Sequence, residues 1–319
     1  MAGEPERPYL IHLPDGYDPE QRYPVLYVLH GASGSAEVMA ATTCSSTFAG
    51  LGRRPDLGDA TCLHNVARGY IVVYANGRPI REANGRVQRG WEAGGGRVVE
   101  GRRYRCTTPA VGDCGRASSD DVGYFIALHA EVSGAYSVDG SRVYLAGISN
   151  GAAMSFRLAC ALPEVVSGIA AVAGANQFMV NMLGGVDCNV ANQPVAMLLI
   201  HGDADPIWKH DGSPGTLGQE HFVSPRETLH GFRGAAGWLA MNACTGSERS
   251  ELAAEGGNAV QVESGVGCRA PVRYLRVPGG GHTWPNGWQY LPEAMVGETR
   301  RDLSANETIL EFFDSLASP

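Results

Sequence analysis

Seven short apolar runs, rich in β-branched residues, recur along the chain between polar or glycine-containing segments. The runs are YLIHL (9–13), PVLYVLH (24–30), YIVVYA (70–75), RVYLAG (142–147), GIAAVAG (168–174), VAMLLIH (195–201) and VRYLRV (272–277). Runs that are apolar almost throughout, rather than at every second position, are typical of strands buried on both faces, as in a parallel sheet. The pattern therefore predicts seven buried strands.

Three longer segments have apolar residues at helical spacing: 118–136, 150–162 and 304–316. The first includes Asp120 and Asp121, which are suited to capping a helix, and the last has Ser304 and Glu307 at capping-box spacing. Strands that alternate with helices predict an α/β fold, with a mostly parallel central sheet flanked by helices. Ligands of such folds bind beyond the carboxyl ends of the strands.

We expect the chain to form a single domain, 1–319. Single cores grow to roughly 250–300 residues, and long loops account for the rest of the length. The segments 92–117 and 202–228 are rich in Gly, Arg and Pro and lack periodicity. They are long for connectors, so we interpret them as loop insertions that border a functional site.

Composition and charge narrow the class of protein. Apolar residues make up 44% of the chain and charged residues 18%, which fits a globular protein. The net charge of −8, without a dense run of Lys and Arg, argues against nucleic acid as a partner. No window approaches the roughly 20 consecutive apolar residues that cross a bilayer, so we expect no membrane span. The histidines lack metal-ligand spacing, and we expect no metal site.

The eight cysteines form no C-x-x-C pair, and the short intervals between them suggest sequential disulfides: Cys44–Cys62, Cys106–Cys114, Cys160–Cys188 and Cys244–Cys268. The alternative is that several are buried free thiols, as a cytosolic chain would tolerate. The N-terminus lacks the pattern of a secretion signal, so the chain is either cytosolic or exported with its signal absent from this sequence. The cysteine count favours export.

The segment LAGISNGAAM (145–154) places Ser149 between Gly147 and Gly151, after a predicted strand and before a predicted helix. In a G-x-S-x-G turn of this kind the serine backbone is strained, and larger side chains two positions away would collide. The hydroxyl is then exposed at a helix N-terminus, where N–H groups favour negative charge. The alternative is an ordinary strand-to-helix turn, but the position favours a nucleophile.

A serine hydroxyl becomes nucleophilic when an imidazole takes its proton, and in this type of sheet the order along the chain is Ser, acid, His. We expect His282, in the glycine-rich turn after the last predicted strand, to be the base. Surface or packing roles are expected for the other histidines after the serine, at 201, 210, 221 and 230. For the acid we favour Asp205 over Asp203, because three residues past Gly202 let the chain swing the carboxylate back toward the histidine.

Two backbone N–H groups would hold the oxyanion that forms in such a reaction. One belongs to Asn150, directly after the nucleophile, and the other to the turn LHGASGS (29–35), where we assign it to Ala32. The alternative for His30-Gly31 is that it simply ends a strand.

Taken together, HGASGS, SSDDVGYF, RVYLAGISNGAAMSFRLAC, IHGDADP and GGGHTWPNG resemble secreted α/β-hydrolases. That family includes short polyhydroxybutyrate depolymerases, LpqC-like esterases and the feruloyl esterases of carbohydrate esterase family 1. The resemblance runs from about residue 8 to the end of the chain. It implies Ser149, Asp205 and His282 as a catalytic triad, Trp284 near the substrate, and an exported, disulfide-bearing protein that acts without a cofactor.

We therefore expect a secreted serine carboxylesterase. Its substrates would be feruloyl or acetyl esters of plant polysaccharide, or polyhydroxyalkanoate-type polyesters. Trp284 and then Trp91 are the expected aromatic contacts with substrate, the alternative being that such residues only cap the core. Two other functions stay open: a non-catalytic binding or adhesion protein on the same fold, and a serine peptidase. The sequence does not indicate an oligomeric state.

Overall fold

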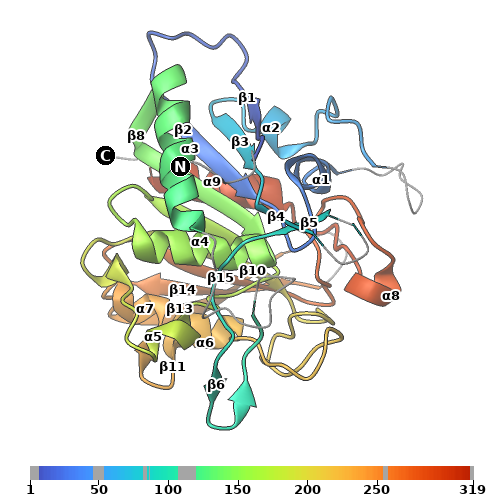
Figure 1. The fold of residues 1–319 in the computed structure, drawn as a ribbon, viewed down its shortest axis with the longest axis vertical. Helices are drawn as coiled ribbons and strands as arrows, with labels where there is room; N and C mark the ends of the chain where they lie inside the picture. The colour runs from blue at the N-terminus through green and yellow to red at the C-terminus, as the bar shows by residue number, and fades with distance from the viewer. Residues whose placement is uncertain are drawn as a thin grey trace.

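The computed structural model describes residues 7–45, 54–81, 85, 87–106, 120–253 and 258–316. These residues form a central sheet with helices packed against both of its faces (Figure 1). The α/β-hydrolase architecture expected from the sequence is confirmed, and all seven predicted strands lie in this sheet. Residues 107–117 of the first predicted loop insertion, Cys114 among them, lie outside the described residues.

Nine strands of the described chain make the sheet. In order across it they are β1 (Leu10–His12), β3 (Ile71–Ala75), β2 (Tyr23–Leu29), β8 (Val138–Ile148), β9 (Gly168–Val172), β10 (Ala196–Gly202), β15 (Val272–Val277), β14 (Val260–Val266) and β13 (Gly246–Leu252). The strands from β3 across to β15 are parallel, whereas β1 pairs antiparallel with β3 at one edge, and β14 pairs antiparallel with both β15 and β13 at the other. The carboxyl ends of β2, β8, β10 and β15 therefore share one edge of the sheet, where parallel folds bind ligands.

The apolar pattern does not reveal β13 and β14. Every residue of β13 is exposed, and β14 buries only Val260 and Val262. Neither strand therefore has the near-continuous apolar run by which the central strands are recognised. An antiparallel extension can leave one face in water, so few apolar residues are enough to hold it.

Helices and small hairpins complete the fold. The helices are α1 (Ala36–Thr42), α2 (Leu63–Val66), α3 (Asp121–Ala135), α4 (Asn150–Ala161), α5 (Met179–Met182), the 3₁₀ helix η1 (Asn189–Ala191), α6 (Pro225–His230), α7 (Trp238–Met241), α8 (Glu293–Val296) and α9 (Ala305–Leu316). The hairpins pair β4 (Arg78–Arg81) with β5 (Val87–Gly90), β6 (Val98–Val99) with β7 (Arg102–Arg103), and β11 (Gly231–Phe232) with β12 (Ala235–Ala236). No described helix is both long and apolar enough to span a bilayer.

The three helices predicted from the sequence are α3, α4 and α9. The Asp120 carboxylate accepts the Gly123 N–H (2.7 Å) and so caps α3, as expected. The Ser304 hydroxyl accepts the Glu307 N–H (3.3 Å) at the start of α9. Each side chain satisfies a backbone donor that the first turn of a helix leaves without a partner.

The core lies in two layers, one on each face of the sheet. On one face α3 and α4 pack through residues such as Phe125 and Phe156, and Figure 1 shows these helices in front of the sheet. On the other face α1 and α9 pack through residues such as Met39 and Phe312. Strands covered on both sides must be apolar on both sides, which explains the runs seen in the sequence.

Three of the four predicted disulfides are confirmed: Cys44–Cys62, Cys160–Cys188 and Cys244–Cys268. Cys106 is also disulfide-bonded, while its predicted partner lies outside the described residues. No cysteine of the described chain is a free thiol. The alternative of buried free thiols is thereby excluded for these seven residues.

Asp121 does not cap α3, contrary to the expectation from its position. Its buried carboxylate instead pairs with Arg7 (2.5 Å) and accepts the N–H of Glu92 (2.7 Å). A helix has one N-cap position, which Asp120 occupies, so the next carboxylate is free to make tertiary contacts. This ion pair ties the first described residue of the chain to α3 and to the segment that follows β5.

Candidate active site

Ser149 lies at a sharp turn between β8 and α4. Its φ of 56° falls in the left-handed region, which is strained for a residue with a side chain. A Cβ on Gly147 would lie 2.5 Å from the carbonyl carbon of Gly151, and one on Gly151 would lie 2.7 Å from the His30 carbonyl oxygen. The two glycines are therefore needed for close backbone approach, as the G-x-S-x-G pattern predicts. The serine itself is partly exposed.

Asp205 and His282 are in direct contact beyond the ends of β10 and β15. His282 Nδ1 lies 2.7 Å from Asp205 Oδ2, and both side chains are almost fully buried. The other carboxylate oxygen accepts the N–H groups of Ile207 and Trp208, each at 2.8 Å. Three hydrogen bonds thus fix the carboxylate, and charge-assisted bonds of this kind are stronger than neutral ones.

Asp203, the other acid considered from the sequence, is used elsewhere. Its Oδ1 accepts the Gly279 N–H (2.7 Å), and its Oδ2 pairs with Arg276 (3.1 Å). These contacts join the ends of β10 and β15. The carboxylate that contacts the imidazole of His282 is therefore that of Asp205, not that of Asp203.

The turn that carries His282 is held from outside the sheet. The His282 N–H donates to the Val296 carbonyl at the end of α8, and the Tyr290 hydroxyl donates to the His282 carbonyl (2.8 Å). A Cβ on Gly281 would press against the backbone of Val296 and Gly297. The glycine therefore lets the turn approach α8 closely, and this contact sets the position of the imidazole.

The sheet places Ser149 at the same edge as the other two residues. Ser149 follows β8 and Asp205 follows β10, two strands away. At about 4.8 Å per strand, the ends of these two strands are roughly 10 Å apart. Ser149 and His282 make no direct hydrogen bond within the described chain, so the direct contact in this structure is the one between His282 and Asp205.

A second imidazole, that of His201, borders the same carboxylate. Its Nε2 donates to the Trp208 carbonyl (2.7 Å) and lies 3.5 Å from Asp205 Oδ2. Burial lowers the pKa of His201, which keeps the ring neutral. The residue is the last but one of β10 and is a packed, hydrogen-bonded side chain, in agreement with the packing role expected from the sequence.

The turn after β2 lies against the serine. A Cβ on Gly31 would be 3.5 Å from the Cβ of Ser149. The Ala32 N–H next to it, and the Asn150 N–H at the start of α4, donate no hydrogen bond within the described part of the chain. The two backbone N–H groups that the sequence assigns to an oxyanion hole therefore have no acceptor within the described chain, and they belong to the turn next to Ser149 and to the residue directly after it.

The tryptophans expected to touch substrate are buried instead. Trp284 is completely buried, and its indole N–H donates to Asn306 (2.9 Å). Trp91 is 2% exposed, and its indole N–H donates to the His30 carbonyl (3.0 Å). Both rings are surrounded by protein, which favours the alternative that they support the core beneath the loops.

Two cavities border this end of the sheet. One of about 410 Å³ is lined by the segment from Asp203 to Asp211, which includes Asp205. A second of about 630 Å³ lies against β13, β14 and α6. Neither Ser149 nor His282 lines either cavity. The described residues contain no cluster of His, Cys, Asp and Glu that could hold a metal ion.

Known proteins resemble this chain over nearly all of its length. It is 32% identical over 324 residues to NocK of Nocardia uniformis subsp. tsuyamanensis, a protein named for an inferred esterase activity, and the match covers 96% of this chain and 78% of NocK. The chain belongs to this esterase family. Feruloyl esterase C of Emericella nidulans is 23% identical to the esterase described here over 274 residues, which are 86% of this chain and 76% of that protein. No protein-family model matches the chain.

Solved structures of other esterases share the fold. Esterase PE8 aligns with a TM-score of 0.52 at 14% identity, over 98% of this chain and 100% of that one. Acetyl xylan esterase from Aspergillus awamori aligns with a TM-score of 0.50 at 13% identity, over 97% and 94% of the two chains. The esterase family suspected from the sequence motifs is confirmed by the relatives, and its architecture by these structures.

The sequence did not reveal the polar contacts that surround the serine. His30, Trp91 and Asn150 come together from positions about 60 residues apart. The one local signal is the placement of Trp91 directly before the irregular segment 92–117. A tryptophan directly before a long loop is as typical of a side chain that packs in the core and fixes the start of the loop as of one that contacts substrate.

Proposed function

We propose that this esterase is a serine carboxylesterase in which Ser149 is the nucleophile, His282 the general base and Asp205 the acid that orients the imidazole. The observation that carries the proposal is the buried contact between His282 Nδ1 and Asp205 Oδ2, at the same edge of the sheet as the strained Ser149. Because the carboxylate holds the proton of the imidazole on Nδ1, Nε2 is left bare and able to accept a proton.

In the acylation step His282 Nε2 takes the proton of the Ser149 hydroxyl while Oγ attacks the ester carbonyl carbon. The carbonyl electron pair moves onto oxygen, and the N–H groups of Ala32 and Asn150 stabilise the oxyanion. The tetrahedral intermediate then collapses, the bond to the alcohol oxygen breaks, and the imidazolium protonates the leaving alkoxide. An acyl-enzyme on Ser149 and a free alcohol result.

Deacylation repeats these steps with water. His282 takes a proton from the water molecule as its oxygen attacks the acyl carbon, and the same two N–H groups stabilise the second oxyanion. Collapse releases the carboxylic acid, and the imidazolium returns its proton to Ser149 Oγ. The cycle consumes one ester and one water and needs no cofactor.

For the substrate we propose feruloyl or acetyl esters of plant polysaccharide, with polyhydroxyalkanoate-type polyesters as the second class. The names of the relatives support the first class, since one is a feruloyl esterase and one structural neighbour an acetyl xylan esterase. A panel of methyl ferulate, acetylated xylan, a hydroxybutyrate oligomer and a peptide p-nitroanilide separates these classes. Release from the hydroxybutyrate oligomer without release from ferulate overturns the first class, and cleavage of the anilide alone indicates a peptidase.

We propose that the esterase is exported. All seven cysteines of the described chain are in disulfides, and structural disulfides persist in oxidising compartments. Expression in an oxidising and in a reducing compartment, followed by thiol titration of the folded protein, tests this. Equal yield and stability of the fully reduced protein contradict export.

A fluorophosphonate probe tests the proposed nucleophile. Stoichiometric labelling of the wild type, lost in Ser149→Ala together with at least about 10⁴-fold of the esterase activity, supports the mechanism. Absence of labelling in the folded wild type contradicts it and indicates a binding protein on the same fold.

A further inference from the structure

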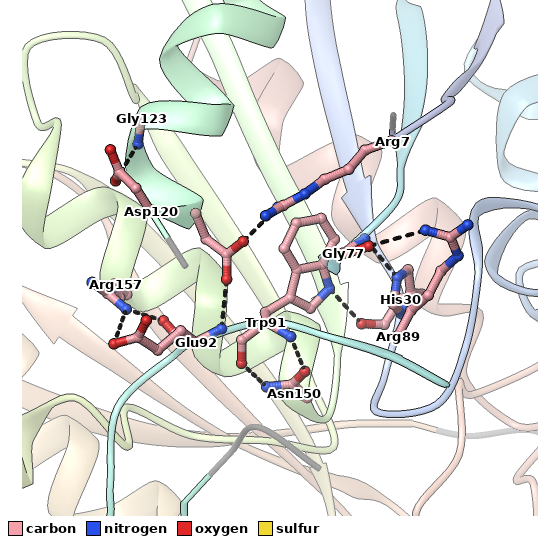
Figure 2. Close-up of polar contacts among 11 residues, drawn as sticks. Arg7, His30, Gly77, Arg89, Trp91, Glu92, Asp120, Gly123, Asn150 and Arg157 are labelled. Atoms are coloured by element: carbon pink, nitrogen blue, oxygen red, sulfur yellow. Dashed lines mark hydrogen bonds and ion pairs between the residues drawn. The ribbon is translucent and has the colours of Figure 1, made fainter. Parts of the chain in front are cut away.

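A buried network of hydrogen bonds joins the turn after β2 to the start of α4, the two segments that carry the proposed oxyanion donors. Figure 2 shows Trp91 at its centre, between His30 on the turn after β2 and Asn150 at the start of α4. Trp91 and Asn150 are 2% and 3% exposed, and His30 is 1% exposed. None of these three side chains has a part in the proton transfers described above.

The first half of the network fixes Asn150. Its side-chain oxygen accepts the backbone N–H of Trp91 (2.7 Å), and its amide nitrogen donates to the backbone carbonyl of Trp91 (2.8 Å). A backbone N–H can only donate and a carbonyl can only accept, so the orientation of the Asn150 amide is determined. The paired bonds hold the residue whose own backbone N–H lies directly after the nucleophile.

The second half fixes the turn of Ala32 through His30. The Gly77 N–H donates to His30 Nε2 (2.9 Å), so that nitrogen is the bare one and the proton of the neutral ring is on Nδ1. The His30 Nδ1–H group donates a hydrogen bond to the Gly31 carbonyl oxygen (2.6 Å), which also accepts the Gly34 N–H (3.1 Å). Burial lowers the pKa of His30 to about 4, so the ring stays neutral at the pH at which esters are cleaved enzymatically.

The orientation of the Gly31 carbonyl decides where the next N–H points. In a trans peptide the C=O and the following N–H point in opposite directions. With the Gly31 oxygen held by His30 and Gly34, the Ala32 N–H points in the opposite direction within the peptide plane, where it has no partner in the described chain.

Trp91 links the two halves of the network, the one around Asn150 and the one around His30. Its indole N–H donates to the His30 carbonyl (3.0 Å), while its backbone holds the Asn150 side chain. A displacement of either loop would therefore break a bond to the same buried tryptophan.

We propose that His30 and Trp91 are positioning residues that hold the N–H groups of Ala32 and Asn150 at a fixed separation, and so build the oxyanion hole before substrate binds. This inference rests on the proposed serine mechanism and deepens it. Oxyanion donors act only when they are aimed at the position that the developing charge will occupy, and loss of one donor typically costs about 10²–10³-fold in kcat. A donor that is misaimed rather than removed loses part of this effect.

Two substitutions of His30 separate its two hydrogen bonds. In His30→Asn the amide nitrogen can take the place of Nδ1 and still donate to the Gly31 carbonyl, while the acceptor for Gly77 is lost. In His30→Gln the amide oxygen can take the place of Nε2 and accept the Gly77 N–H, while the donor to Gly31 is lost. Both variants lose one buried hydrogen bond, but only His30→Gln releases the peptide that directs Ala32; the free energy of unfolding of each is measured so that a loss of kcat is not mistaken for a loss of folded protein.

Trp91→Phe provides a variant that is independent of His30. It keeps most of the ring volume and the backbone bonds to Asn150, and removes only the indole N–H that donates to the His30 carbonyl. Because it leaves His30 itself and the backbone bonds to Asn150 unchanged, it keeps the proposal testable if a His30 variant fails to fold.

The measurement is kcat and KM for a p-nitrophenyl ester and for its thiono analogue, in which sulfur replaces the carbonyl oxygen. Sulfur is a weaker hydrogen-bond acceptor, so an intact oxyanion hole favours the oxygen ester. We expect kcat for the oxygen ester to fall about 10- to 100-fold in His30→Gln and about 5- to 20-fold in Trp91→Phe, with KM within about threefold. The preference for oxygen over sulfur falls in parallel, while His30→Asn stays within about fivefold of the wild type.

The outcomes separate this inference from the proposed function. If the wild type cleaves the ester and reacts with fluorophosphonate, but His30→Gln and His30→Asn lose kcat equally with an unchanged oxygen preference, the residues are merely structural and the inference is wrong. Wild-type kinetics in all three variants also overturn it. If the wild type neither cleaves the ester nor reacts with the probe, the proposed function fails, and the inference fails with it.

Discussion

Replacing Asp205 with Asn should abolish most of the esterase activity, because it moves the imidazole proton of His282 to the wrong nitrogen. The hydrogen bonds around Asp205 determine which way the introduced amide is oriented. One carboxylate oxygen accepts two backbone N–H groups at 2.8 Å, and the other faces His282 Nδ1 at 2.7 Å. An asparagine oxygen will occupy the first position, since the reverse orientation would set an NH₂ group against two N–H donors. The NH₂ group of the amide then faces His282 Nδ1.

A donor at that position favours the wrong tautomer of the imidazole. In the variant Asp205→Asn, His282 must turn a bare Nδ1 toward the introduced amide, so its proton moves to Nε2 and no base remains for Ser149. Reversing the amide would leave two buried N–H groups without partners, at about 1–3 kcal/mol each, so it offers no escape. In triads of this type the same substitution costs about 10⁴-fold in kcat, equivalent to about 5 kcal/mol of transition-state stabilisation.

The assay is the rate of acylation by a p-nitrophenyl ester under single-turnover conditions, with the active sites titrated separately. Asp203→Asn is the matched control, because its amide oxygen can still accept the Gly279 N–H and the pair that it loses, with Arg276, is partly exposed. We expect the control to stay within about threefold of the wild type, since exposed ion pairs contribute about 1 kcal/mol or less. An Asp205→Asn enzyme within tenfold of the wild type would refute the reasoning.

Three further predictions concern stability and burial. Replacing Cys160 and Cys188 together by Ala opens a loop of 28 residues and should lower the free energy of unfolding by about 3–4 kcal/mol, measured by urea denaturation; an unchanged midpoint contradicts this. Trp284→Phe leaves the buried Asn306 oxygen without its indole donor, so the melting temperature should fall while KM stays within twofold; a large rise in KM would restore the substrate contact expected from the sequence. The pKa of His30 is about 4 in the folded protein and 6.5 when unfolded, so the unfolded state binds more protons between these values and stability falls as pH drops through this window. At pH 4.5 the wild type should therefore have lost about 2 kcal/mol more than His30→Gln relative to pH 7, and equal losses in the two proteins would contradict the assignment.

The fold could be predicted from the sequence where burial leaves a local pattern. The central strands carry apolar runs because helices cover both faces of the sheet. They are β3, β2, β8, β9, β10 and β15. The exposed strand β13 has no such run, and its partner β14 has only two buried valines. These two strands could be found only through their pairing with β15, which is a tertiary contact.

The candidate site divides in the same way. Ser149 is marked by glycines two positions away on either side, because the backbone collision that they avoid is local. Asp205 and His282 could be proposed from their order after strand ends, and the structure brings their side chains together. What surrounds them could not be predicted, since the bonds from Trp91 to His30 and Asn150 depend on packing between distant segments.

The tryptophans show why exposure is hard to infer from position. Trp91 and Trp284 both lie outside the central strands, in segments that the sequence places at the edge where parallel α/β folds bind ligands, and substrate contacts are expected there. In the structure each indole N–H is used by a buried acceptor, His30 and Asn306 respectively. A tryptophan whose polar atom is satisfied inside the protein gains more from burial than from a place in an open cleft.

The buried ion pair between Arg7 and Asp121 limits how many residues can be removed or replaced at the amino-terminal end. A truncation that removes Arg7 would leave the buried Asp121 carboxylate without this ion-pair partner. For pairs of this kind the free energy of unfolding falls by about 3–5 kcal/mol. The same carboxylate accepts the N–H of Glu92, next to Trp91. Since Trp91 is hydrogen-bonded to Asn150, loss of Arg7 would also disturb the residues beside Ser149. Fusion partners and affinity handles at this end should therefore be joined well ahead of Arg7.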